Sequence, residues 1–185
     1  MAYNPTTVAN YFIDKYSKTG NITPMKIIKL TYIAYGWYLA LTNKRDRLID
    51  ENPIAWDFGP VFPSLYYSIK QYKKEKITEK IPNANKNEKI TSEDEQFLDK
   101  IWEVYGRFDG IYLSALTHIE GTPWQKVYQK DSNAIISDDF RKQLLERSKK
   151  INEKYLQLPE DNSKRMKELA EEITKDYTNQ YDKAE

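Results

Sequence analysis

Apolar residues recur every three or four positions through much of the chain, a spacing that predicts a mainly helical protein. The first such stretch runs from about Pro5 to Lys18 and stops at Gly20. The next runs from Pro24 to about Leu41, with Thr23 as its expected N-cap. From Leu30 onward this second helix is apolar on nearly every side, which is typical of a helix at the centre of a fold.

A period of two replaces the helical period in one short stretch. Ile54, Trp56 and Phe58 alternate with smaller or polar residues, which predicts a strand and thus a small β element near residues 54–60. Gly59-Pro60 is expected to end this strand. The pattern therefore predicts a compact helical domain that carries one small β element.

Helix-start and helix-stop signals divide the middle of the chain. Thr91 begins a capping-box sequence, and Gly121 suits the end of a helix over residues 111–119. Further helical starts are expected at Pro63-Ser64 and at Thr122-Pro123-Trp124. Residues 73–90 are rich in Lys, Asn and Glu and are expected to form an exposed loop.

After Ser137 the apolar residues form two narrow stripes, separated by Pro159. The first consists of Leu144, Ser148, Ile151, Tyr155 and Leu158, and the second of Met166, Leu169, Ile173 and Tyr177. We therefore expect a helical domain over residues 1–158 and a charged, amphipathic helical extension over residues 159–185. The second stripe either folds back on the helix before it or binds a partner, and we favour folding back.

Composition excludes several classes of protein. The chain has 185 residues, no Cys and a net charge of +1, so it has neither disulfides nor the basic excess usual in proteins that bind nucleic acid through phosphates. No signal peptide is visible, and the longest apolar run, Tyr32 to Leu41, is about half the length that spans a bilayer. We expect a cytoplasmic protein without membrane or nucleic-acid partners.

His118, the only histidine, is the main candidate for chemistry. Ser114 lies one helical turn before it and Glu120 two residues after it, so a hydrolase with Ser114 as nucleophile and His118 as base is conceivable. No strained Gly-x-Ser-x-Gly turn surrounds the serine, however. We favour a histidine that bonds to carbonyls or packs on a tryptophan, and we expect a protein that is not an enzyme.

Neither a metal nor a cofactor is predicted. One His and no Cys leave only carboxylates as ligands, and the 6 glycines form no phosphate-binding loop. The first two predicted helices, joined by a short turn, have the order of a helix-turn-helix. Only Lys26 and Lys29 near the start of the second helix would reach base edges, which argues against DNA binding.

Three segments together resemble a known family. They are Lys29-Leu-Thr-Tyr-Ile-Ala-Tyr-Gly-Trp-Tyr-Leu-Ala-Leu-Thr42, Ile54-Ala-Trp-Asp-Phe-Gly-Pro-Val-Phe-Pro-Ser-Leu-Tyr66 and Leu113-Ser-Ala-Leu-Thr-His-Ile-Glu-Gly-Thr-Pro-Trp124. Their order and spacing resemble those of the Panacea domain, the family of SocA-like antitoxins and phage-associated proteins. The resemblance covers about residues 5–155, and the extension after residue 159 runs past the usual end of the domain.

The resemblance implies an antitoxin that binds and neutralises a toxin encoded nearby. The alternative is a phage or mobile-element protein that binds a host defence or protease component, as an adaptor or inhibitor. The expected partner-binding residues are Asp57, Phe58, Gly59, Pro60, Thr117, His118 and Glu120. The expected scaffold residues are Trp37, Trp56, Pro63, Tyr66, Leu113, Pro123 and Trp124.

Overall fold

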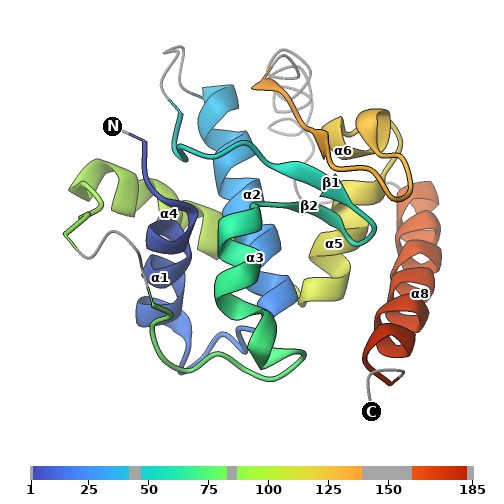
Figure 1. Cartoon of the computed structure of the whole chain (residues 1–185), viewed down its shortest axis with the longest axis horizontal. Helices are drawn as coiled ribbons and strands as arrows, with labels where there is room; N and C mark the ends of the chain where they lie inside the picture. The colour runs from blue at the N-terminus through green and yellow to red at the C-terminus, as the bar shows by residue number, and fades with distance from the viewer. Residues whose placement is uncertain (1, 42–46, 83–86, 139–159, 183–185) are drawn as a thin grey trace.

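A computed structural model describes residues 2–41, 47–82, 87–138 and 160–182 (Figure 1). The helices are α1 (Pro5–Tyr16), α2 (Pro24–Leu41), α3 (Pro63–Ile69), α4 (Ser92–Tyr105), α5 (Gly110–His118), α6 (Pro123–Val127) and α8 (Glu160–Asp182), with a 3-10 turn η1 (Lys70–Tyr72) after α3. The strands are β1 (Ile54–Trp56), β2 (Gly59–Val61) and β3 (Ala134–Ile135). The predicted fold class, mainly helical with a small β element, is confirmed.

The helix starts lie where the local signals predicted them. Thr91 and Thr122 are the N-caps of α4 and α6, and their side-chain oxygens accept hydrogen bonds from the backbone N–H groups of Asp94 and Gln125. A hydroxyl in this position satisfies one of the N–H groups that have no partner within the first turn of a helix. These starts depend on neighbours three residues away, which is why the sequence alone predicts them.

Helix α2 forms the centre of the molecule (Figure 1). It contacts α1, α3, α4, α5 and β2, so it is covered on nearly all sides. Most of its apolar residues are buried, and Ile27 and Leu30 are fully so, whereas Leu41 at its end is exposed. Burying one such side chain stabilises a fold by about 1.5–3 kcal/mol, so the central position of α2 follows from its composition.

Burial of α2 also takes a lysine out of water. Lys26 is only 4 % exposed, and its ammonium donates to the carbonyl oxygens of Gly20 and Gly106, each 2.6 Å away. The same ammonium lies 5.0 Å from the centre of the Trp102 ring. Gly106 is the C-cap of α4, where a positive charge is favourable. Lys26 therefore joins α2 to the ends of two neighbouring segments.

The β element is a three-stranded antiparallel sheet in the order β2-β1-β3. The prediction that one strand runs to Phe58 and ends at Gly59-Pro60 is wrong. Trp56 pairs with Gly59, so Asp57 and Phe58 form the turn, and Gly59 begins the second strand. A proline is tolerated in β2 because β2 is an edge strand and needs no ladder partner on its outer side.

Helix α8 lies along α5 at one side of the molecule (Figure 1). Leu169 and Ile173 form a small buried cluster with Ala115 of α5. Leu169 and Ile173 of the second C-terminal stripe thus fold back on α5. The first stripe, Leu144 to Leu158, lies outside the described residues. No helix in the described part of the chain is long and apolar enough to cross a membrane.

We predict that a chain ending at Pro159 still unfolds cooperatively. The main core cluster contains no residue of α8, whereas Leu169 and Ile173 belong to a separate cluster. Losing the burial of these two side chains should lower the free energy of unfolding by about 3–6 kcal/mol. Circular dichroism during urea unfolding measures this loss, and a broad, non-cooperative transition would contradict a domain boundary near residue 159.

Candidate functional site

The expected site surrounds the turn between β1 and β2, where α5 packs against the hairpin. Gly59 has φ of +102°, a conformation that residues with a Cβ rarely adopt. A Cβ at this position would lie 2.6 Å from Thr117 Oγ1 and 2.9 Å from Lys29 Nζ. The close approach of β2, α2 and α5 therefore requires glycine.

Hydroxyl groups of α5 and the segment after it hold backbone carbonyls. Ser114 Oγ donates to the carbonyl of Phe58 in the hairpin turn, at 2.6 Å. Thr117 Oγ1 donates to the carbonyl of Ser114, and Thr122 Oγ1 donates to the carbonyl of Thr117, each at 2.6 Å. These three buried hydroxyls fix the turn to α5 and α5 to the start of α6.

His118 lies between two backbone carbonyls. Its Nδ1 is 2.7 Å from the carbonyl oxygen of Ser114, and its Nε2 is 3.1 Å from that of Asp57. The imidazole centre is 3.9 Å from the ring centre of Trp124. Burial lowers the pKa of His118, while the two carbonyls oppose this effect. The interpretation favoured from the sequence, a histidine that bonds to carbonyls and packs on a tryptophan, is confirmed.

The three residues considered for hydrolysis do not form a catalytic triad. Ser114 is fully buried and its hydroxyl donates a hydrogen bond to the Phe58 carbonyl, while the His118 ring nitrogens face carbonyl oxygens. Glu120 is exposed. A nucleophile must be within reach of both its base and its substrate, and the observed contacts provide neither. Within the described ranges, no group of three or more acidic or histidine residues is arranged to hold a metal ion.

The expected partner-binding residues have very different exposures. Asp57 and Glu120 are exposed, whereas Gly59, Pro60 and Thr117 are buried. Phe58 and His118 are half-buried, and the Phe58 ring makes an edge contact with Tyr177 of α8, with 5.4 Å between ring centres. Hairpin and α5 residues thus lie together, but most of their side chains face the interior.

The expected scaffold residues also divide into two groups. Leu113, Pro123 and Trp124 are buried, and the Trp124 indole donates to the carbonyl of Trp56 at 2.9 Å. Trp37 is half-buried and its indole donates to Tyr105 at 2.8 Å, while Pro63 begins α3. Trp56 and Tyr66 are half-buried as well, and these two line a pocket.

Lys29, which the sequence analysis considered only as a possible contact to base edges, lines this pocket. Lys29 is 3 % exposed, and its ammonium donates to the carbonyl oxygen of Pro60 at 2.9 Å. Burial lowers the pKa of Lys29 to about 7. Neither Lys26 nor Lys29 is exposed enough to read bases. The missed signal was the apolar character of α2, because a helix buried on all sides must bury its lysines too.

Comparison with known proteins identifies the family. Residues 27–125 match the model of the family described as antitoxin SocA-like, Panacea domain. This match spans more than half of the 185 residues and contains the hairpin, α3 and α5. The chain therefore belongs to the SocA-like Panacea family, as the resemblance implied. No curated protein and no solved structure shows a significant match.

We predict that Gly59→Ala is more destabilising than Gly121→Ala. Both glycines have positive φ, so either alanine should cost about 1–2 kcal/mol in backbone strain. A Cβ at Gly121 would meet no atom within 4 Å, whereas one at Gly59 would clash with Thr117 and Lys29. This overpacking should add about 1–3 kcal/mol. Equal losses in urea unfolding would contradict the close packing at Gly59.

We also predict that stability rises between pH 7 and pH 10. The pKa of Lys29 is about 7 in the folded protein against its ordinary 10.5, so between these values the unfolded chain holds a proton that the folded chain lacks. The free energy of unfolding should therefore increase by up to about 1.4 kcal/mol per pH unit. Above pH 10 the buried tyrosines reverse the trend, because burial raises the pKa of Tyr32 above its ordinary 10.0.

The variant Lys29→Met isolates the contribution of Lys29 to the pH dependence of stability. The variant should show a shallower rise of unfolding free energy with pH, although some rise remains because burial also lowers the pKa of Lys26. Denaturant unfolding at several pH values measures both slopes. Identical slopes in the two proteins would show that Lys29 is not buried as described.

Proposed function

We propose that this protein is an antitoxin that neutralises a cognate toxin by binding it directly. Membership of the SocA-like Panacea family carries the proposal. The contacts in the described residues support a binding role, because the hydroxyl of Ser114 and the ring of His118 hold backbone carbonyls in place. A rigid hairpin on a buried helix is a suitable base for a binding surface.

The outer face of the sheet offers that surface. Ile54 and Ile135 are paired residues on β1 and β3, so their side chains lie on the same face. Trp56 follows two residues after Ile54 and shares this face, while Ala55 between them is fully buried. Tyr67 of α3 lies beside Trp56, with 6.4 Å between ring centres. We call Ile54, Trp56, Tyr67 and Ile135 the sheet-face patch.

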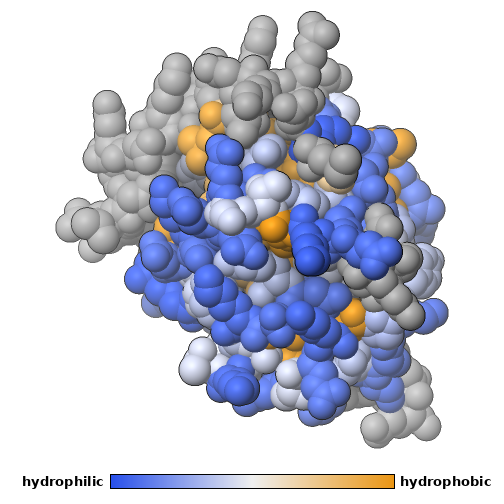
Figure 2. Space-filling view, turned by 90° about the vertical axis from the view of Figure 1, so that its left-hand side faces the viewer, coloured by the Kyte–Doolittle hydropathy of each residue, from blue (hydrophilic) through white to orange (hydrophobic). Residues whose placement is uncertain are grey.

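The chemistry of this patch suits a protein partner. Tyr67 is 59 % exposed and Ile135 is 57 % exposed, which are high values for large apolar side chains. Aromatic residues next to aliphatic ones are the usual centres of protein interfaces. By contrast, the face of the molecule bearing α1 and α4 is largely hydrophilic, with small separate apolar spots (Figure 2). We therefore assign the toxin contact to the sheet side.

The residues expected from the sequence contribute to this contact in two ways. Asp57 is exposed at the tip of the hairpin, where a partner on the sheet-face patch reaches it, and the Tyr128 hydroxyl donates to its carboxylate at 3.0 Å. The hairpin that carries Trp56 is held in place by three buried residues, Gly59, Pro60 and Thr117. Residues 1–158 form the binding domain in this proposal, and α8 supports it from the side.

Co-expression with the neighbouring gene tests the antitoxin role. The neighbouring gene should be lethal alone and harmless together with this protein. Tyr67→Asp with Ile135→Asp should weaken toxin binding about tenfold or more, because charges would enter the centre of the interface. Val104→Asp is the matched control: this valine is 40 % exposed on α4, away from the patch, so binding should stay unchanged.

Binding is measured with the purified full chain and toxin by calorimetry. A neighbouring gene that is harmless alone, or that remains lethal in the presence of this protein, would contradict the antitoxin role. Equal effects of the patch variant and of Val104→Asp would contradict the patch. The toxin level in cells separates sequestration from delivery to a protease, since delivery depletes the toxin.

A further inference from the structure

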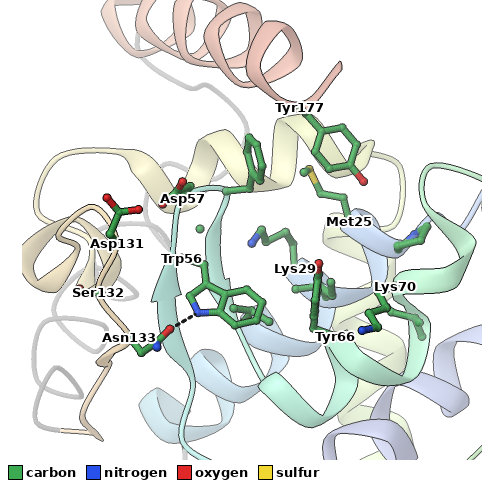
Figure 3. A pocket seen from close by; sticks show the side chains of 16 residues that line it. Met25, Lys29, Trp56, Asp57, Tyr66, Lys70, Asp131, Ser132, Asn133 and Tyr177 are labelled. Carbon is green, nitrogen blue, oxygen red and sulfur yellow. Dashed lines mark hydrogen bonds between the residues drawn. The ribbon is translucent and has the colours of Figure 1, made fainter. Parts of the chain in front are cut away.

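A pocket of about 390 Å³ opens beside the sheet-face patch. Its walls come from the start of α2, the β1–β2 hairpin, α3 and the end of α8 (Figure 3). Met25, Trp56 and Tyr66 provide apolar and aromatic surface, and Tyr177 of α8 forms part of one side. Pockets of about 300–1,000 Å³ commonly hold small ligands, so this one is large enough for a small organic group or a single partner side chain.

The ammonium group of Lys29 belongs to the wall of this pocket. Figure 3 shows the Lys29 side chain crossing the pocket toward the hairpin, with Trp56 and Tyr66 nearby. An ammonium carries three N–H donors. In the part of the chain that the structure describes, Pro60 supplies its only acceptor, at 2.9 Å. The group is thus almost fully removed from water and still has donors to spare.

Lys26, three residues earlier on the same helix, is a buried lysine with a structural role and serves as a comparison for the contacts of Lys29. Its ammonium has two carbonyl acceptors and the face of Trp102, and Lys26 is not among the residues that line this pocket. Lys29 has half as many acceptors and faces a cavity. Since buried cations normally have hydrogen-bonding or ionic partners, the difference points to a partner that comes from outside the chain.

The charges around Lys29 do not supply such a partner. Burial alone lowers its pKa, with no contribution from a carboxylate in the described residues. Asp57 and Asp131 line the pocket near the hairpin, and Lys70 lines it on the side of α3. On α5, the pKa of His118 is lowered mainly by burial, and the charge of Lys29 adds to this effect. Tyr66 and Tyr177 complete the titratable groups that line the pocket.

We propose that the pocket binds a carboxylate joined to an apolar group, with Lys29 as its ionic partner and Trp56 and Tyr66 holding the apolar part. A carboxylate matches the charge of Lys29, the buried lysine that lines the pocket, and accepts its spare N–H donors. A phosphate requires more donors, and the two aspartates near the hairpin oppose a polyanion.

The identity of the natural ligand rests on the proposed function: the source of this carboxylate is the toxin. The pocket adjoins the sheet-face patch through Trp56, so a bound partner can place an acidic group there while covering the patch. The carboxylate belongs either to the chain terminus of the partner or to an acidic side chain. The two sources share the same chemistry and differ in what is attached to it.

Two small carboxylates and one neutral analogue test the pocket in the purified full chain. N-acetyl-L-leucine represents a chain terminus, the α-amide of N-acetyl-L-glutamate represents an acidic side chain, and N-acetyl-L-leucinamide lacks the charge. Nuclear magnetic resonance follows the Lys29 ammonium and the Trp56 indole during each titration. At least one carboxylate should bind saturably and raise the pKa of Lys29 from about 7 toward its ordinary 10.5. The carboxylate that binds identifies the source.

Lys29→Met and Lys26→Met form a matched pair of variants. Lys29→Met should bind the carboxylate about tenfold or more weakly and should unfold at the same or a higher temperature, because it removes a poorly satisfied charge. Lys26→Met should melt at a lower temperature and bind as the unchanged protein does. The neutral analogue keeps the test decisive if either variant fails to fold.

Binding of N-acetyl-L-leucinamide as tight as that of the carboxylate that binds, no response to either carboxylate, or unchanged carboxylate affinity in folded Lys29→Met would each overturn the pocket proposal. These outcomes are independent of toxin neutralisation. Carboxylate binding by a protein that neutralises no toxin contradicts only the antitoxin role. Neutralisation by a protein that binds no carboxylate contradicts only the pocket.

Discussion

The burial of α2 is the constraint on which the other features depend. A helix that is apolar almost all round must be covered by other elements, and here α1, α3, α4, α5 and the hairpin provide that cover. The two lysines near its start are buried with it. Lys26 is satisfied by carbonyls at the ends of neighbouring segments, and Lys29 fixes the edge strand β2 through Pro60. The site therefore arises where a buried helix and a hairpin meet over one charged group.

Local signals predicted most of the helices, because caps and periodicity depend on residues a few positions apart. Thr91 and Thr122 cap the helices that they were expected to cap. The hairpin was only half predicted: the alternation around Trp56 was recognised, but Gly59 begins a second strand instead of ending the first. Strand β3 was missed because its two residues carry no pattern of their own and pair with β1 from about 80 positions away.

The candidate site was harder to predict than the fold. The sequence drew attention to His118, whose contacts are with backbone carbonyls, and it treated Lys29 only as a possible contact to bases. Exposure is a property of the whole fold. The glycine, threonine and histidine of the motif suggested an exposed binding surface. In the structure Gly59 and Thr117 are interior, because α5 packs against the hairpin. The motif lies within the family match, and these two of its residues are buried in this chain.

Tyr177 links two parts of the molecule that the family match does not join. The match ends at residue 125, whereas Tyr177 belongs to α8, lines the pocket and contacts the ring of Phe58 in the hairpin turn. Docking of α8 and occupation of the pocket are therefore thermodynamically linked. An occupant that touches Tyr177 strengthens the attachment of α8, and by reciprocity a loosened α8 weakens the hold on the occupant. In the proposed site, the packing of α8 on α5 would therefore contribute to the affinity for the occupant, although α8 lies outside the family match.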